Sequence, residues 1–273
     1  PAAFGPLAGQ QFLQLILLGY LPGSQNSEQS TFTEELQFQG ESAGGRLNWQ
    51  AGGYMEISNP LGYSVQFTPF LLNCTDAQAF QCAKGVSPTS SSISTPWQKR
   101  WYRSYALYAQ GTYDFTDQLA VTAGARYTWD KQRHEYDGTA IRFPAANTPE
   151  WFCNNALRNG NPDGSVRIIQ PYDYQSCFLE YKTSSSKPTW SISLEYKPVS
   201  DVLLFGKWSR GYRSGGVNSP YNFFETWGPE KVDTYEIGAK TSFRGGVRGY
   251  FNVTGFYNDF RNQQIQATLQ AKQ

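Results

Sequence analysis

Apolar and polar residues alternate with a period of two along much of the chain. In residues 46–57, one side of the pattern carries Trp49 and Met55, and the other carries Gln50 and Glu56. Successive side chains of a β-strand point to opposite faces of a sheet, so this run predicts a strand with one apolar and one polar face. Comparable alternation predicts further strands at residues 31–39, 104–115, 119–130, 189–197, 202–208, 234–243 and 247–258.

Several of these predicted strands are unusually long. A strand in a soluble protein commonly has about five or six residues, whereas a strand tilted across a bilayer needs about 9–11. Aromatic pairs stand at the ends of two apolar rows, Tyr113 with Phe115 and Tyr127 with Trp129. Aromatic girdles occupy such positions in transmembrane barrels. The pattern therefore predicts an all-β fold, a partial antiparallel transmembrane β-barrel of about nine long strands.

The connections between predicted strands alternate in length. Short ones fall at 40–45, 114–118, 198–201 and 244–246, and long ones at 59–100, 134–187 and 211–229. Outer-membrane barrels have short periplasmic turns and long extracellular loops. A soluble β-sandwich has no reason to keep this rhythm. Residues 1–30 fit it less well and are treated as a poorly defined N-terminal segment, in which residues 11–20 could form one more strand.

Composition excludes several other classes. Hydrophobic residues make up 39% of the chain and aromatic residues 16%, and no run of 18 apolar residues occurs, which argues against a helical membrane protein. The net charge of +1 comes without a basic stripe, so nucleic acid is not an expected partner. A barrel in which only every second residue meets lipid accounts for low hydrophobicity combined with many aromatics.

The four cysteines fall as two pairs within predicted long loops. Cys74 with Cys82 and Cys153 with Cys177 predict two disulfides in an oxidising compartment. A zinc site is the alternative, but the sequence has no CxxC motif and His134 is its only histidine. No metal and no cofactor are expected.

Nothing in the sequence predicts catalysis. GxSxG, P-loop, GxGxxG and HExxH motifs do not occur. His134 lies at a predicted strand end and is expected to be a solvated loop residue. The glycine-rich stretch 210–216 lacks the strand–helix context of a phosphate-binding loop and is interpreted as a strand that runs into a loop. We therefore expect a protein that is not an enzyme and has no catalytic residues.

Five segments resemble strands of TonB-dependent outer-membrane receptors of the siderophore type. They are TEELQF at 33–38, SYALYAQGTYDFTDQLAVTAGARYT at 104–128, KPTW at 187–190 followed by SRGYRSGG at 209–216, PEKVDTYEIGAK at 229–240, and 252–264. The resemblance implies a twenty-two-stranded barrel with an N-terminal plug, located in the bacterial outer membrane. It also implies import of siderophores, cobalamin or glycans with the help of TonB. No plug-like segment is recognised before the strands, so residues 31–273 are expected to be a fragment of such a barrel.

The resemblance implies membrane lipid, TonB acting through a plug, and a small ligand as partners, with a ferric siderophore as the favoured ligand. A passive porin-like channel and a soluble glycan-binding module are the alternatives. Inward charged residues are expected to contact the plug or the lumen: Arg46, Arg126, Glu195, Lys197, Lys207, Glu236, Lys240 and Arg248. Aromatics and arginines typically anchor recognition, so the candidates for ligand contact at the extracellular mouth are Trp97, Trp101, Trp151, Tyr212, Arg213 and Trp227.

Overall fold

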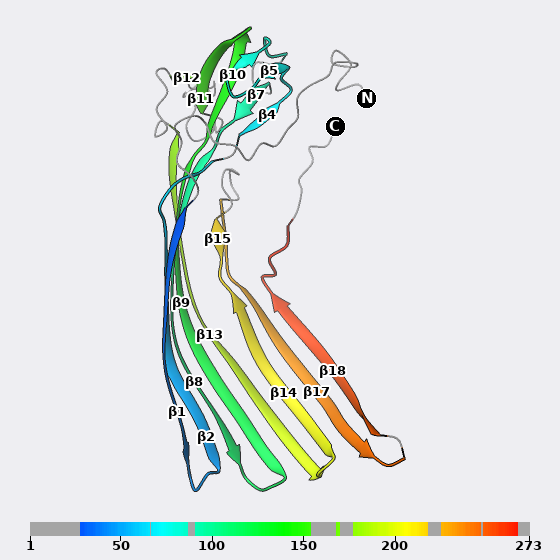
Figure 1. The fold of residues 1–273 in the computed structure, drawn as a ribbon. Coiled ribbons are helices and arrows are strands. Elements are labelled where there is room, and N and C mark those ends of the chain that lie inside the picture. Colours follow the sequence, from blue (N-terminus) through cyan, green and yellow to red (C-terminus); the bar gives the residue numbers. More distant parts are fainter. Residues whose placement is uncertain are drawn as a thin grey trace.

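One curved antiparallel sheet dominates a computed structural model of the chain (Figure 1). The structure describes residues 28–65, 67–86, 91–153, 168–169, 177–217, 225–246 and 248–266, so the possible strand at 11–20 lies outside the described residues. Eight long strands pair in chain order: β1 (Gln29–Ser42), β2 (Leu47–Pro60), β8 (Trp97–Asp114), β9 (Leu119–Asp137), β13 (Phe178–Val199), β14 (Val202–Arg213), β17 (Glu230–Arg244) and β18 (Arg248–Arg261). The two-residue β3 (Ser64–Val65) also pairs with β8. The predicted all-β partial barrel is confirmed.

Three strands extend well beyond their predicted ends, and the first of them, β8, begins at Trp97. β9 continues to Asp137 and β13 begins at Phe178, so the connection expected at 134–187 is confined to 138–177. Both faces of these extensions carry many polar side chains, such as Lys131 and Gln132, and the period-two contrast in hydropathy disappears there. Backbone pairing does not need that contrast, and the β9–β13 ladder is continuous up to the Phe178–Asp137 pair.

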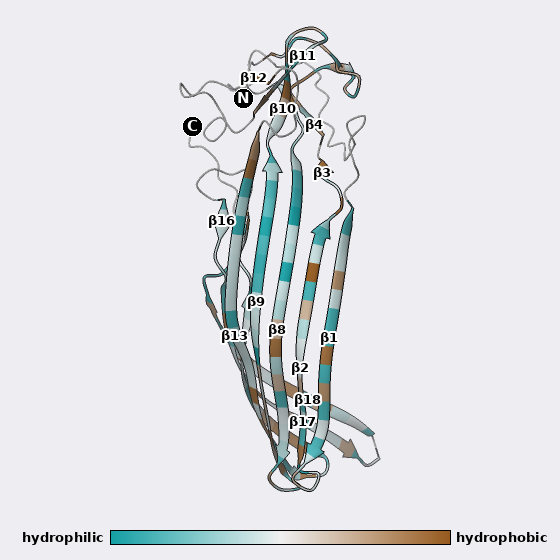
Figure 2. Ribbon diagram, turned by 90° about the vertical axis from the view of Figure 1, so that its left-hand side faces the viewer, coloured by the Kyte–Doolittle hydropathy of each residue, from teal (hydrophilic) through white to brown (hydrophobic). Residues whose placement is uncertain are grey.

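The register places the predicted apolar positions of neighbouring strands on one face of the sheet, here called the apolar face. Met55 lies opposite Tyr105, and Tyr105 lies opposite Trp129. Large side chains on this face are exposed, with Ile237 at 72% and Leu107 at 62%. A continuous exposed surface of this kind is rare in water and suits contact with lipid. In Figure 2 the upper parts of β8 and β9 are hydrophilic, and hydrophobic positions appear further down β8.

Aromatic side chains border the apolar band at both ends. A row on adjacent strands joins Trp190, Trp208, Tyr235 and Tyr257, with ring centroids 5.5, 6.2 and 6.4 Å apart. Toward the short turns, Tyr113 and Phe115 stack edge-on at 4.8 Å. We call the first set, together with Tyr105, Tyr127 and Trp129, the upper aromatic row. Two such rows mark the interfaces of a membrane-spanning sheet.

Polar contacts run across strands on the opposite face, here called the polar face. The Tyr108 side chain crosses Gly52 and its hydroxyl donates to Glu35 Oε1 at 2.6 Å. A Cβ atom at residue 52 would lie 2.5 Å from the Leu36 carbonyl oxygen and 2.6 Å from the Tyr108 hydroxyl, so this crossing needs a glycine. The Arg126 guanidinium lies 6.0 Å from the same Tyr108 ring.

Short turns join the strands at one end of the sheet. The β1–β2 turn uses positive φ angles at Ala43, Gly44 and Gly45, and the two glycines adopt them without steric cost. In the β8–β9 turn, the Thr116 hydroxyl accepts hydrogen bonds from the backbone N–H groups of Gln118 and Leu119. Long connections stand at the other end, as predicted. No helix of the described residues has the length and apolar character to cross a membrane.

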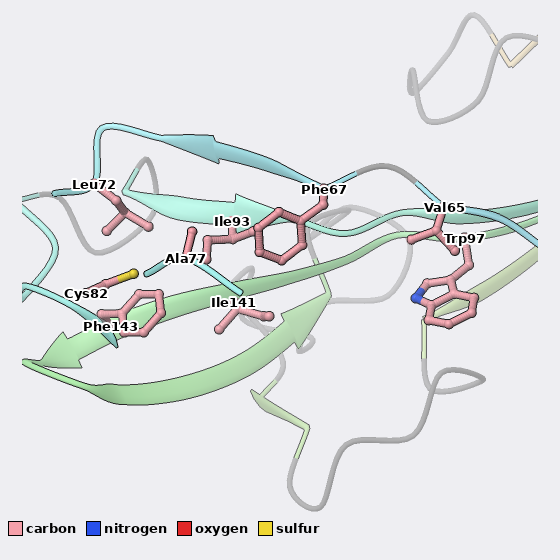
Figure 3. Packing of buried hydrophobic residues seen from close by; sticks show 9 residues of the cluster. All are labelled: Val65, Phe67, Leu72, Ala77, Cys82, Ile93, Trp97, Ile141 and Phe143. Carbon is pink, nitrogen blue, oxygen red and sulfur yellow. The ribbon is translucent and has the colours of Figure 1, made fainter. Parts of the chain in front are cut away.

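The first two long connections fold together into a separate small sheet, which the sequence did not predict. Its order is β12 (Ile168–Ile169), β11 (Thr148–Cys153), β10 (Thr139–Ala145), β7 (Ser92–Ser94) and β4 (Thr68–Phe70). The core beside it (Figure 3) is made of Val65, Phe67, Leu72, Ala77, Cys82, Ile93, Trp97, Ile141 and Phe143. Since these residues come from both connections, neither connection forms the core alone. We call this unit the loop sheet.

Both cysteine pairs are disulfide-bonded in the structure. Cys74 joins Cys82 across the hairpin of β5 (Cys74–Asp76) and β6 (Gln81–Cys82). Cys153 at the end of β11 joins Cys177, with 5.4 Å between their Cα atoms, and links the loop sheet to the start of β13.

Candidate functional site

Above the upper aromatic row, β14 separates from β13. Their ladder ends at the Trp190–Arg210 pair, while β13 remains paired with β9. The continuation of β14 leads into β15 (Gly216–Val217), which pairs with β16 (Thr226–Trp227). The Gln132 side-chain amide donates to the Gly215 carbonyl at 3.0 Å. This contact joins the β14 extension to the polar face of β9.

Asp130 is the centre of the contact between β9 and the end of β14. Its side chain lies on the polar face and the residue is 4% exposed. The Tyr102 hydroxyl donates to Oδ1 at 2.9 Å, and the Tyr212 hydroxyl donates to Oδ2 at 2.6 Å. The Ser185 hydroxyl also bonds to Tyr212. One carboxylate therefore positions two phenols that come from different strands.

Both phenols stay protonated at neutral pH. Burial raises the pKa of Tyr102 to about 12, and the neighbouring Asp130 carboxylate adds to the shift. The pKa of Tyr212 is also raised, first by burial and then by its bond to Asp130. A protonated phenol can donate to the buried carboxylate, and each donation offsets part of the cost of burying that charge.

A cavity of about 250 Å³ opens beside Asp130, and we call it the mouth pocket. Gln132 and Ser185 from the polar face line it, with Trp227 from β16. The Trp227 indole lies across Gly216, where a Cβ atom would be 2.5 Å from Cζ2 of the indole ring. Trp227 is 43% exposed, so part of its ring surface remains open to a ligand.

Two of the six predicted contact residues belong to this site. Tyr212 is bonded to Asp130, and Trp227 lines the pocket. Arg213 stands beside them at the exposed end of β14, opposite Glu230 in the β14–β17 ladder.

The other three predicted residues lie elsewhere. Trp97 is 9% exposed and packs edge-on against Tyr63 at 5.5 Å, within the core of the loop sheet. Trp151 lies on β11, with its ring 5.5 Å from that of Phe80. Trp101 lies on the upward continuation of the apolar face, and the Arg133 guanidinium lies over its ring, 4.7 Å from the ring centroid. The structure does not bring these tryptophans to the mouth pocket.

Sequence reasoning did not single out Asp130, Tyr102, Gln132 or Ser185. Asp130 did carry a usable signal, since it ends the polar row of the 119–130 alternation directly after the aromatic pair. Such a position is just outside the membrane and faces inward. Nothing in the sequence indicates that the end of β14 reaches it, because that contact joins residues 82 apart in the chain.

The expectation that His134 is a solvated loop residue is wrong. His134 lies within β9 and is 2% exposed, because the strand extends beyond its predicted end. Burial lowers its pKa to about 4, with the Arg100 charge as a second cause, so the imidazole is neutral at pH 7. Neither ring nitrogen has a hydrogen-bond partner within the described part of the chain. The described residues also contain no cluster of three or more potential metal ligands.

Comparisons with known proteins agree with this architecture. Residues 7–272 match the family model described as "TonB dependent receptor-like, beta-barrel". The structure resembles the ferric yersiniabactin uptake receptor FyuA from Yersinia pestis, with a TM-score of 0.56 and 16% sequence identity. The likeness covers 88% of this chain and 30% of that receptor chain. No curated protein matches the sequence. The chain belongs to the family of TonB-dependent receptor-like β-barrels.

Proposed function

We propose that the chain forms part of the barrel wall of a bacterial outer-membrane receptor for TonB-energised uptake of a scarce ligand, a ferric siderophore. The observation that carries the proposal is the mouth pocket, which lies on the polar side of the wall above the upper aromatic row. Ligands of a barrel enter by this side. Membership of the family supports a receptor or transporter rather than an enzyme.

The chemistry of the mouth pocket suits capture of one arm of a ligand. Its volume of about 250 Å³ is below the ~300–1,000 Å³ usual for a whole small-molecule site. Trp227 offers an exposed aromatic face, and tryptophan and tyrosine are frequent energetic anchors in binding. Asp130 already accepts from Tyr102 and Tyr212, so its role is to position these phenols.

The inward charges below the pocket suit a different contact. Lys207 Nζ lies 3.4 Å from Glu236 Oε1, and Arg126 lies 5.3 Å from the Tyr54 ring, all on the polar face. These groups are held by neighbours in the wall and line the lumen. We assign them to contact with a plug, through which TonB would act, and the apolar face to contact with outer-membrane lipid.

Uptake by cells that carry the intact gene tests the ligand site. Replacing Trp227 with alanine is expected to raise the half-saturating concentration of a radiolabelled ferric siderophore about 10-fold, the equivalent of about 1.4 kcal/mol. Phe178→Ala is the matched control, because that exposed aromatic points away from the pocket on the apolar-face side of β13. An equal effect of both variants, or none of Trp227→Ala, contradicts the assigned site.

Energised uptake and ligand class are tested in the same cells. Deleting TonB, or dissipating the proton-motive force, is expected to abolish accumulation of the ferric siderophore. Accumulation at the full rate without TonB identifies a passive channel instead. Uptake of a glycan or of cobalamin, with no ferric siderophore of the catecholate, hydroxamate or phenolate classes taken up, contradicts the ligand class.

A further inference from the structure

The upward continuation of the apolar face carries a dense group of cations. Above the upper aromatic row, the outward positions of β8, β9 and β13 hold five basic side chains and two acidic ones that reach the surface, and Asp137 at the end of β9 is buried. The basic residues are Lys99, Arg103, Lys131, Arg133 and Lys182, and the acidic residues at the surface are Glu135 and Glu180. We call this group the outer basic patch. It lies on the surface that faces away from the lumen and therefore away from the mouth pocket.

The height of the patch above the apolar band follows from the ladder register. Arg103 and Lys131 lie directly opposite each other, two residues beyond the Tyr105–Trp129 pair on the same face. Two residues of a strand correspond to about 7 Å. The headgroup region adds roughly 5–8 Å to each side of the hydrocarbon core. If the aromatic pair marks the edge of the hydrocarbon, Arg103 and Lys131 reach the headgroup layer.

The cations of the patch differ in how they are neutralised. Arg133 Nε lies 2.6 Å from Glu180 Oε2, and Lys182 pairs with the same carboxylate. Lys182 and Arg133 together hold the pKa of Glu180 below its usual value. Arg103 and Lys131 have no carboxylate partner among the described residues. Like charges directly opposite in a ladder destabilise a sheet, so this pair favours binding of an anion.

A cavity of about 450 Å³ lies at this pair. Arg103, Lys131, Arg133 and Lys182 line it, together with Trp101 and the small polar residue Ser184, and no carboxylate does. Arginine forks suit the geometry of phosphate oxygens, and lysine adds a mobile point charge. The outward position and height place these groups beside lipid headgroups. We propose that the outer basic patch binds the phosphate of an anionic lipid headgroup.

Lipid binding to the intact protein, purified in a neutral maltoside detergent, tests this assignment. The probes are dioleoyl phosphatidic acid and, for comparison, dioleoyl phosphatidylcholine, measured by native mass spectrometry of retained lipid. The double variant Arg103→Gln/Lys131→Gln is expected to bind phosphatidic acid about 30-fold more weakly, at about 1 kcal/mol for each cation near the lipid surface. The matched control Arg46→Gln/Arg248→Gln removes two exposed inward cations near the short turns and is expected to stay within about twofold.

Each outcome decides for or against the proposal. Unchanged binding of phosphatidic acid by the Arg103/Lys131 variant overturns it, as does equal weakening in the control. Preference for phosphatidylcholine overturns it too. Inorganic pyrophosphate that binds the patch as tightly as the lipid, with the same loss in the variant, identifies a free phosphate site instead. If the double variant does not assemble, Lys182→Gln gives the same test, with about fivefold weaker binding expected.

Discussion

Replacing Ile192 with arginine is expected to lower the free energy of unfolding of the membrane-inserted barrel by about 2–4 kcal/mol. Ile192 lies on the apolar face, is 45% exposed and stands opposite Ala123 and Trp208 in the two flanking ladders. It follows Trp190 of the upper aromatic row by two residues, well inside the apolar band. A guanidinium there must enter hydrocarbon or distort the bilayer, and both cost free energy. Denaturant titration of the intact protein in lipid vesicles measures the loss.

The adjacent residue provides the control. Ser191→Arg introduces the same charge in the same strand, but Ser191 lies on the polar face between Gly124 and Ser209. Its guanidinium would point into the lumen, where water or polar groups can solvate it, and we expect a loss below about 1 kcal/mol. Equal losses for the two arginine variants would contradict the assignment of the two faces.

The second large effect is expected from removal of the disulfide between Cys153 and Cys177. It closes a loop with a sequence separation of 24, for which the chain-entropy model gives about 3 kcal/mol. Both cysteines are buried, and they link the end of β11 to the start of β13. The variant Cys153→Ser/Cys177→Ser should therefore loosen the loop sheet and leave the barrel strands intact.

Hydrogen exchange of the intact protein measures this effect locally. Amides of β10 and β11 are expected to exchange about 10²-fold faster in the double serine variant, since about 1.4 kcal/mol corresponds to a factor of ten. Amides of β17 serve as the internal control, because β17 pairs with β14 and β18 in the long sheet and none of these strands belongs to the loop sheet. Unchanged exchange in β10 and β11 would show that packing of the core holds the loop sheet without this bond.

The barrel strands were predictable because lipid imposes a strict period of two on their sequence. Residues such as Trp49, Leu107 and Ile192 must be apolar, and their neighbours are free to be polar. The loop sheet was not predictable from that pattern. Its β7 has three residues, and β7 pairs with β10 about 48 positions further along the chain. Short strands with distant partners leave no local periodicity to detect.

The candidate site was predictable only in part. Residue type drew attention to Tyr212 and Trp227, which the structure places at the mouth pocket, but the same criterion selected Trp97, which packs into the core of the loop sheet. An aromatic residue in a long loop can serve a core or a ligand, and only the fold distinguishes the two. Asp130 was placed in an inward row, and Tyr102 lies on β8, the partner of β9 in a predicted hairpin. The approach of Tyr212 from β14 is not encoded locally in the sequence.

Spin labels placed one at a time at residues 189–196 test most directly which face of the sheet meets lipid. The labels are read in the intact protein in lipid vesicles as collision rates with oxygen, which concentrates in hydrocarbon, and with a water-soluble nickel chelate. We predict oxygen maxima at residues 190, 192 and 194, which share the apolar face, and minima at 191, 193 and 195. Collision rates without a period of two, or high nickel accessibility on both faces, would contradict the barrel-wall assignment.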